Sequence, residues 1–289
     1  MMGLAGQFRM IACDKCGLIR QDPRLIWSCL SRYYPAEYTA YAGYMGERSR
    51  LRRLDQGYGL WKRLRAVEQY QRGGHLLDVG CGTGAFLHEA KRTGRWDVTG
   101  IEPNEVAVNE ARRVTGATVF SGQFSQFVLP HDQFDVITMW TVLEHLADPI
   151  SDLRRCRDLL RDRGWLIFSL PNLEGIEARM FGSSWAGWDL PRHLHVFPRK
   201  LLKTILERMG FRLVAARCVS SSYAALGHTL GFWSRPWGAH YPLLRRALVG
   251  TYGLLPVRIA LGVPLWLADR LQASSIITFF AQKSDMAGA

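Results

Sequence analysis

The sequence has no internal repeat and no low-complexity stretch, which excludes solenoid and other repeat architectures for its 289 residues. Its six cysteines lack the regular spacing of a secreted disulfide scaffold, so we expect a reducing compartment, the cytoplasm. The first dozen residues also lack the basic start and apolar run of a signal peptide, and export is therefore not expected.

Acidic residues are comparatively few: the sequence has 25 Asp and Glu and 37 Lys and Arg, which gives a formal net charge of +12. Such a balance is compatible with a nucleic-acid or an anionic-membrane partner. The basic residues, however, concentrate in two predicted helices, 48–72 and 154–163, whose polar faces must be solvated in any case. The hydrophobic content of 48% is sufficient for the full core of one α/β domain with appendages.

Turn-forming residues and the periodicity of apolar side chains divide the chain into four parts. Residues 1–46 are irregular and aromatic, with five tyrosines around Pro35, and are interpreted as a small appendage. Residues 47–72 carry apolar side chains at helical spacing and end at Gly73 and Gly74, which predicts a leading helix. Residues 73–220 together with 274–284 form the predicted core domain, and the apolar, Trp- and Pro-rich stretch 221–273 is a predicted helical insertion.

Strand-like and helix-like segments alternate along the core domain. Strands are predicted at 75–79, 97–101, 117–120, 134–139, 165–170, 212–219 and 275–281, and helices at 84–93, 105–114, 149–161 and 199–209. Alternation of this kind predicts an α/β fold, Rossmann-like, with a mostly parallel sheet and helices on both faces.

The turn after the first strand of this series is rich in glycine and reads LLDVGCGTGAF, residues 76–86. Glycines at Gly80, Gly82 and Gly84 permit close approach of a ligand, and the following helix offers free N–H groups. Glu102 ends the next strand, twenty residues after Gly82, where a carboxylate can accept hydrogen bonds from both hydroxyls of a ribose. The pair predicts an adenosine-type ligand.

A nicotinamide dinucleotide is the rival ligand, because Gly80, Gly82 and Ala85 also satisfy a degenerate dinucleotide fingerprint. Asp78 argues against it, since a carboxylate beside the loop would repel a pyrophosphate but can attract a cationic amino-acid moiety. A Tyr and Lys pair for hydride chemistry occurs only as Tyr58 and Lys62 on the leading helix, where Tyr58 is interpreted as packing.

Four blocks together, LLDVGCGTGAF, VTGIEPN, FDVITMWTVLEHLADP and GWLIFSLPN, resemble the class I S-adenosylmethionine-dependent methyltransferases over residues 76–172. The resemblance implies a seven-stranded sheet whose reversed final strand is 275–281. It also implies a cofactor site with the methionine moiety near Asp78 and Gly80 and the ribose on Glu102. The candidate cofactor-binding residues are Asp78, Gly80, Cys81, Gly82, Gly84, Glu102, Gln123, Phe124 and Trp140.

Three of these candidates have specific expected roles. Family members often bind the adenine amino group with an acid after the third strand, but here Gln123 and Phe124 stand there, so an amide oxygen and a stacking ring are expected instead. Trp140 follows the fourth strand, where an aromatic ring can stabilise the sulfonium.

The segments CDKCGLIRQDP, YYPAEY and WAGWDLPRHLHVFPRKLLKTILERMGF look like a narrower bacterial subgroup, similar to ubiquinone-pathway and sugar methyltransferases and often associated with cell-envelope glycan or lipid biosynthesis. Members commonly carry two Cys-x-x-Cys pairs near the amino terminus. This chain has only Cys13 and Cys16, and a tetrahedral zinc site needs four ligands. Either Cys29 or a histidine completes a zinc site, or the knuckle packs without metal.

Three histidines are candidate general bases: His145, His193 and His195. His145 follows the fourth strand with Glu144, and this pair could also hold a divalent metal such as magnesium, as in methyltransferases similar to the ubiquinone-pathway enzyme. His193 and His195 lie in a long loop, 171–197, and loops of that size are usually functional. The alternatives are a structural turn at 143–145 and a structural elbow at 191–197.

The expected reaction is O-methylation of a small-molecule, glycan, lipid-linked or quinone-like acceptor. The alternative is an RNA methyltransferase or a catalytically silent cofactor-binding module, but the chain lacks an Asn-Pro-Pro-Tyr-type motif and an aromatic RNA-binding motif, so nucleic acid is not expected. The apolar stretch 247–268, interrupted by Pro256 and Pro264, is either an interfacial lid at the inner face of the cell membrane or a cap packed within the protein.

Overall fold

The alternating segments form one seven-stranded sheet in the computed structural model, which describes residues 7–34, 50–220 and 222–284. The strand order is β5-β4-β3-β6-β7-β10-β9. The strands are β3 (Gly74–Val79), β4 (Trp96–Glu102), β5 (Thr118–Ser121), β6 (Phe134–Trp140), β7 (Leu160–Pro171), β9 (Phe211–Arg217) and β10 (Ile276–Lys283). β3 to β7 pair in parallel, whereas β10 runs antiparallel to both neighbours, which confirms the predicted fold with its reversed final strand.

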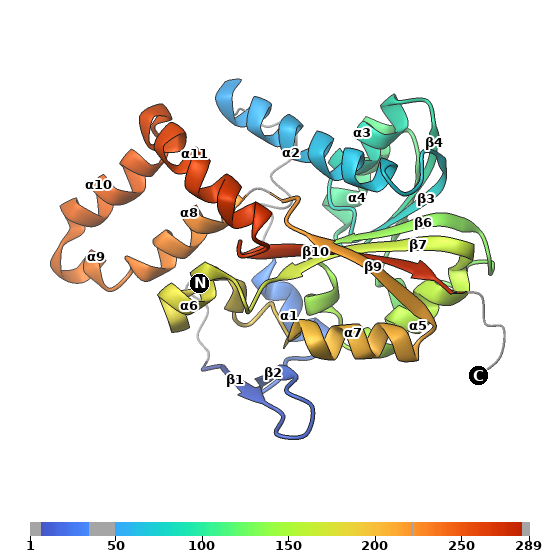
Figure 1. The fold of residues 1–289 in the computed structure, drawn as a ribbon, viewed down its shortest axis with the longest axis horizontal. Helices are drawn as coiled ribbons and strands as arrows, with labels where there is room; N and C mark the ends of the chain where they lie inside the picture. Colours follow the sequence, from blue (N-terminus) through green and yellow to red (C-terminus); the bar gives the residue numbers. More distant parts are fainter. Residues whose placement is uncertain (1–6, 35–49, 221, 285–289) are drawn as a thin grey trace.

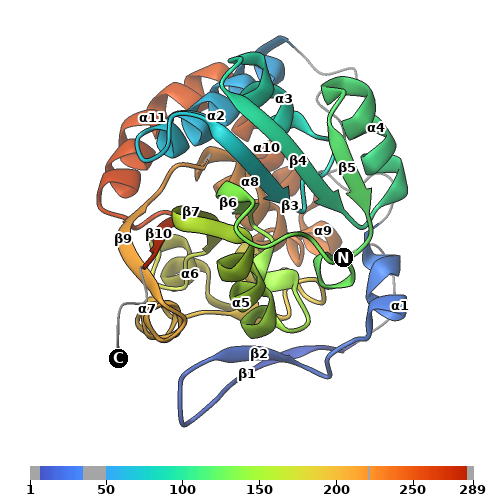
Figure 2. The ribbon, with the colours of Figure 1, turned by 90° about the vertical axis from the view of Figure 1, so that its right-hand side faces the viewer.

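Helices cover both faces of this sheet (Figures 1 and 2). One apolar core includes residues of α2 (Arg50–Glu68), α3 (Ala85–Arg92) and α4 (Glu105–Thr115), and a second includes residues of α5 (Pro149–Leu159) and α7 (Arg199–Arg208). α5 ends two residues before the predicted end, because Leu160 is already extended and pairs with Phe134 of β6. Backbone pairing with the sheet therefore ends the helix.

The leading helix α2 is only half covered, and residues 47–49 of the predicted helix lie outside the described residues. Leu64 and Val67 are buried, whereas Leu54, Tyr58 and Trp61 of the same apolar stripe are 71%, 58% and 47% exposed. Tyr58 packs, as interpreted, but against Trp61 at the surface and not in the core. The first half of α2 extends past the sheet (Figure 1). The helical spacing of its apolar residues therefore predicted more burial than this half of the helix has.

The N-terminal appendage forms a hairpin, β1 (Arg9–Ala12) and β2 (Ile19–Asp22), followed by α1 (Trp27–Leu30) and η1 (Ser31–Tyr33). A third strand, β8 (His195–Val196), joins β2 from the long loop after β7, so that loop ties the appendage to the core. The same loop contains the short helix α6 (Ile176–Phe181). Most of the tyrosine cluster, at positions 38, 41 and 44, lies outside the described residues.

The insertion is helical, as predicted, and consists of α8 (Ser222–Trp233), α9 (Trp237–His240), α10 (Pro242–Tyr252) and α11 (Leu255–Arg270). These helices project from one side of the sheet (Figure 1). The interruption expected at the two prolines is found only near Pro256, because the stretch breaks between α10 and α11 and bends there by 71°. Pro256 lies in the first turn of α11, where no backbone donor is needed, and α11 continues through Pro264 at the loss of one helical hydrogen bond.

Candidate active site

The glycine-rich turn takes a backbone shape that side chains would prevent. Gly80, Gly82 and Gly84 all have positive φ, at 70°, 54° and 77°. A Cβ atom on Gly80 would lie 2.6 Å from a methyl of Val142, and one on Gly84 would lie 2.9 Å from the backbone of Ala111. Glycine is therefore required for conformation and for space at these two positions.

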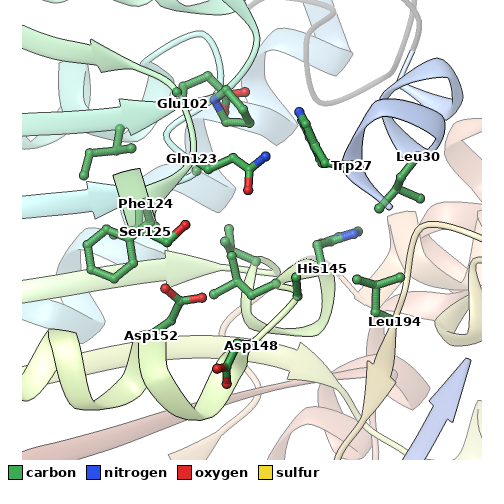
Figure 3. Close-up of a pocket in the computed structure, with 18 of the residues that line it drawn as sticks. Trp27, Leu30, Glu102, Gln123, Phe124, Ser125, His145, Asp148, Asp152 and Leu194 are labelled. Carbon is green, nitrogen blue, oxygen red and sulfur yellow. The ribbon is translucent and has the colours of Figure 1, made fainter. Parts of the chain in front are cut away.

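Glu102 joins this turn to the end of β4. One carboxylate oxygen accepts a hydrogen bond from the Gly82 N–H at 3.0 Å, and the other accepts one from the Asn104 N–H at 2.9 Å. The residue is almost fully buried, yet it lines the cavity (Figure 3). Carboxylate oxygens only accept hydrogen bonds, so this group suits the hydroxyls of a ligand in the cavity.

A cavity of about 380 Å³ lies beyond the ends of β3, β4 and β6. Its lining includes six of the predicted cofactor-binding residues, Gly80, Gly82, Glu102, Gln123, Phe124 and Trp140. Trp27, Leu30, His145 and Leu194 lie on the opposite side (Figure 3), and Leu25 and Tyr34 of the appendage also line the cavity. Two chemically different halves therefore share one cavity.

Asp78, Cys81 and Gly84 lie behind this lining. The Asp78 carboxylate accepts a 2.6 Å hydrogen bond from the Thr138 hydroxyl, and burial raises its pKa to about 7. Cys81 packs its thiol against Gly100, where an added Cβ would lie 2.7 Å from the sulfur. Asp78 and Cys81 thus support the loop from within the sheet, and their contact with a cofactor stays a prediction.

Arg63 of α2 is a site residue that the sequence reasoning missed. Its guanidinium lies 5.1 Å from the centre of the Trp140 ring. Its positive charge favours the ionised form of the Asp78 carboxyl and so opposes the rise in the pKa of Asp78. Burial lowers the pKa of Arg63, although the arginine stays protonated. A cation therefore stands at the predicted methionine end. Arg63 precedes the apolar Leu64 of the helical stripe, which was the one available signal that it lies near the core. The basic residues of this helix were instead predicted to lie on its solvated face.

The predicted adenine end contains an acid that the sequence reasoning also missed. Asp152 of α5 lines the cavity with Gln123 and Phe124, and burial raises its pKa to about 6. Gln123 and Gln126 cap the short helix η2 (Phe124–Gln126) reciprocally, so the Gln123 amide oxygen has one remaining lone pair. Phe124 is buried, and the Arg155 guanidinium lies 5.3 Å from the centre of its ring. Adenine stacking on Phe124 stays a prediction.

Two histidines meet where β6 ends. The rings of His145 in η3 (Leu143–His145) and His193 have centres 4.6 Å apart. His145 Nδ1 lies 3.0 Å from the Arg192 carbonyl oxygen, and His193 Nδ1 lies 2.8 Å from that of Gly187. Because a carbonyl only accepts, His193 Nδ1 must carry the proton, which leaves its Nε2 unprotonated. His145 Nδ1 carries a proton when it donates to the Arg192 carbonyl, whereas the Tyr34 hydroxyl, 2.9 Å from the same nitrogen, would donate to the other tautomer.

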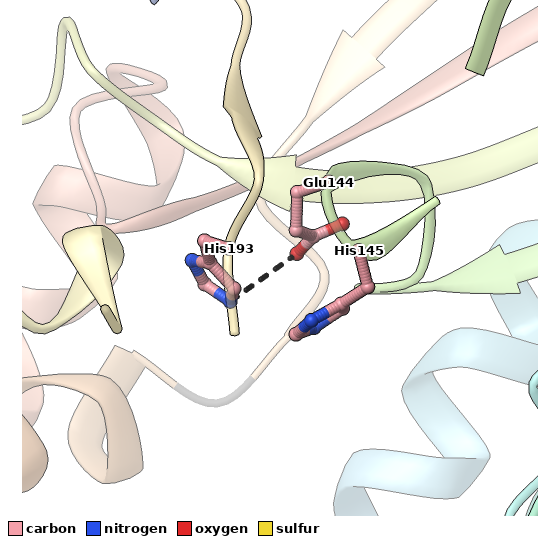
Figure 4. Close-up of side chains that lie close together, drawn as sticks. All are labelled: Glu144, His145 and His193. Carbon is pink, nitrogen blue, oxygen red and sulfur yellow. Dashed lines mark ion pairs between the residues drawn. The ribbon is translucent and has the colours of Figure 1, made fainter. Parts of the chain in front are cut away.

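Glu144 completes this cluster (Figure 4). Its carboxyl is fully buried, neither oxygen has a hydrogen-bond partner among the described residues, and Oε1 lies 3.9 Å from His193 Nε2. Burial raises the Glu144 pKa to about 8, and it lowers the pKa of His145 to about 3 and that of His193. One ligand atom from each residue lies within 4.8 Å of the others. Two neutral imidazoles and one carboxyl suit a base or a divalent metal.

His195 does not join this cluster. It is paired with Arg20 in the small sheet, and its ring lies 5.9 Å from that of Phe197. Burial and the neighbouring Arg24 charge lower its pKa to about 4. His195 is absent from the cavity lining, so only two of the three candidate bases are brought together.

Cys13 and Cys16 lie in the turn between β1 and β2 and are exposed. Among the described residues, the group of three or more potential metal ligands is Glu144, His145 and His193, which contains no cysteine. Cys29 is exposed in α1 and does not complete a set with the pair. The hypothesis of zinc at the hairpin therefore has only two ligands from this part of the chain.

The sequence matches the methyltransferase-domain family over residues 52–216. The ubiquinone biosynthesis O-methyltransferase of Nitrosospira multiformis is 31% identical over 158 residues, which cover 51% of this chain and 66% of that protein. The protein of the same name from Bordetella avium is 30% identical over 174 residues, 54% of this chain and 72% of that protein. The matches thus span roughly two thirds of these relatives.

Solved structures agree in fold. A Thermotoga maritima protein described as an S-adenosylmethionine-dependent methyltransferase, possibly acting on histamine, superposes with a TM-score of 0.54 at 17% identity, covering 90% of this chain and all of that one. The Haemonchus contortus phosphoethanolamine N-methyltransferase 2, in complex with S-adenosylmethionine, gives 0.57 at 14% identity over 93% and 62% of the two chains. With the glycine turn and Glu102, these matches show that the chain belongs to the family of class I S-adenosylmethionine-dependent methyltransferases.

Proposed function

We propose that this protein transfers the methyl group of S-adenosylmethionine to a hydroxyl of a largely apolar, quinone-like acceptor. The observation that carries the proposal is the Glu144, His145 and His193 cluster, which offers two unprotonated imidazole nitrogens beside the cavity. A hydroxyl acceptor must lose a proton during the transfer, and this cluster supplies a group that takes it. The two relatives named for ubiquinone biosynthesis support the same acceptor class.

The cofactor half of the cavity fits the methyl donor. Glu102 would accept the ribose hydroxyls, and Trp140 would lie near the sulfonium. The Arg63 guanidinium, over Trp140, would pair with the carboxylate of the methionine moiety, and Asp78 would attract its ammonium. When bound, the cofactor supplies the activated methyl group, and the chain's own task is to hold donor and acceptor in line.

Asp152 would take over a role that Gln123 was expected to fill alone. Its buried carboxyl lines the cavity beside Gln123, and Figure 3 shows both side chains directed into the same space. A carboxylate is a stronger acceptor for an exocyclic amino group than an amide oxygen. We infer that Asp152 accepts from the adenine amino group, in place of the acid that is missing after β5.

The acceptor half is apolar on the side formed by the appendage. Trp27, Leu30 and Leu194 line it, and the Tyr34 hydroxyl lies 2.9 Å from His145 Nδ1. Apolar and aromatic walls with few polar groups suit a ring carrying hydroxyls better than a glycan, whose many hydroxyls would be left unpaired. Tyr34 thereby connects the acceptor wall to the basic cluster.

Two routes for the proton use the same residues. In one, His145 Nε2 accepts the hydroxyl proton directly, since His145 is the cluster member that lines the cavity. In the other, Glu144, His145 and His193 would hold a divalent cation, which lowers the pKa of a coordinated hydroxyl. The residues fit a cation, because the Glu144 oxygens are buried without hydrogen-bond partners among the described residues and the His193 Nδ1–H is fixed by the Gly187 carbonyl.

Methyl-tritiated S-adenosylmethionine with an alkyl-substituted dihydroxybenzene tests the proposal, with and without a chelator. We expect label on a ring oxygen, and His145→Gln and His193→Gln should each lower turnover at saturating acceptor by about 100-fold or more while cofactor affinity is kept. His195→Gln separates the two loop histidines, because its ring lies outside the cluster. Failure to label the ring, with label instead in the RNA of a cell extract, would overturn the proposed acceptor.

A further inference from the structure

α10 and α11 present an unusual number of apolar side chains to solvent. Neither helix has a buried residue, and six of their large apolar side chains are more than half exposed. These six define the insertion face: Leu243, Leu244, Leu255, Ile259, Val263 and Trp266. Exposed apolar side chains gathered on one pair of helices mark a site of interaction. The alternative of a cap packed entirely within the protein does not account for these exposed side chains.

The length and the bend of this helix pair favour the surface of a bilayer over a crossing of it. No single described helix is long and apolar enough to span a membrane, whereas α10 and α11 together pass that test but are bent by 71°. Arg258 adds a charge in α11, where it pairs with Asp55 of α2 at 2.7 Å. A bent, arginine-containing pair is suited to lie in the interfacial region.

Aromatic residues with basic neighbours border this surface on two adjoining helices. On α11, the Arg270 guanidinium lies 5.1 Å from the Trp266 ring. On α2, the stacked pair Tyr58 and Trp61 has the Lys62 ammonium 5.2 Å from the tyrosine ring. Trp and Tyr are enriched at lipid headgroup level, and neighbouring Lys or Arg extend to the phosphates.

The charge of the insertion is complementary to anionic lipid. Residues 235–270 contain five arginines and one acid, Asp269. The Asp269 carboxylate is engaged within the protein, since it accepts hydrogen bonds from the hydroxyls of Ser222 and Ser274. The insertion is therefore strongly cationic, as a segment that binds an anionic headgroup layer should be.

We propose that the insertion face docks on an anionic lipid bilayer, with the Tyr58 and Trp61 pair at its edge, which places the enzyme at the inner face of the cell membrane. The surface does not depend on the acceptor chemistry, and vesicle binding is measured without any acceptor, so its failure would leave the methyl-transfer proposal intact.

Co-sedimentation of the full chain with vesicles tests this docking. We expect the protein to pellet with phosphatidylcholine vesicles containing phosphatidylglycerol at low salt, and to be released at high salt or from pure phosphatidylcholine. Ile259→Glu combined with Val263→Glu should weaken partitioning by at least about tenfold. Val128→Glu, a matched change at a side chain that is 98% exposed on the loop before β6, should have no effect.

A second pair of variants isolates the charge. Arg246→Gln, in exposed α10, should weaken partitioning by about fivefold, whereas Arg208→Gln at the end of α7 removes the same charge elsewhere and should not. Calorimetric binding of S-adenosylmethionine confirms that each variant is folded. The proposal is overturned if the protein stays in the supernatant at low salt, if the controls lose binding equally, or if sedimentation shows that the insertion face pairs two copies of the chain.

Discussion

Glu144→Gln should make the protein more stable at alkaline pH, although it removes an ionisable group from the candidate active site. Glutamine keeps the shape of the side chain and takes away only its ability to ionise. In the folded protein, burial raises the pKa of Glu144 from 4.5 to about 8, so the buried carboxyl is protonated at neutral pH. An unfolded chain would hold the same group ionised above its ordinary pKa.

The sign and size of the effect follow from this difference in bound protons. Between pH 4.5 and about 8 the folded state holds one proton more than the unfolded state, so the stability contributed by Glu144 is complete below pH 4.5 and is lost as pH rises. At 1.36 kcal/mol per pH unit, the whole interval corresponds to about 5 kcal/mol of unfolding free energy. The loss of unfolding free energy between pH 6 and pH 8 alone is about 2 to 3 kcal/mol.

Urea unfolding at pH 6 and pH 8, measured in metal-free buffer, gives the required comparison. The unfolding free energy of the native protein should fall with pH more steeply than that of Glu144→Gln. Asp152→Asn is the control. Because the pKa of Asp152 is about 6, this carboxyl changes the unfolding free energy mainly below pH 6. Equal pH dependence in the native protein and Glu144→Gln would refute the view that Glu144 is a buried, unpaired carboxyl. A divalent cation that binds the cluster should restore stability at pH 8 in the native protein alone.

Three further variants probe the cofactor and acceptor halves of the cavity. Glu102→Ala should weaken S-adenosylmethionine binding by about 10- to 100-fold in calorimetry, since hydrogen bonds from the ribose hydroxyls to a charged acceptor are lost. Arg63→Met should weaken S-adenosylmethionine about tenfold but leave adenosine unaffected, because adenosine lacks the carboxylate; equal losses would refute the assigned ion pair. Tyr34→Phe removes the hydroxyl 2.9 Å from His145 Nδ1, so turnover should fall several-fold at unchanged cofactor affinity, and a changed affinity instead would place Tyr34 in the cofactor half.

The sequence by itself determined the sheet and the cofactor turn, because both depend on local signals. Alternating apolar runs define strands and helices wherever a chain buries them, and Gly80 and Glu102 are recognisable from their spacing around one strand. The antiparallel last strand was predictable through family resemblance. Its distance in sequence from β9 carried no local information about pairing.

Only the tertiary structure decided which side chains share a site and which face solvent. Arg63 reaches Trp140 from a helix that precedes the cofactor turn, and Tyr34 reaches His145 across 111 positions of sequence. His193 and His195 were equivalent candidates in sequence, yet the first joins Glu144 and the second pairs with Arg20 in the small sheet. Periodicity likewise identifies an apolar stripe without showing what covers it, because burial depends on neighbours that are distant in sequence and that only the folded chain brings together.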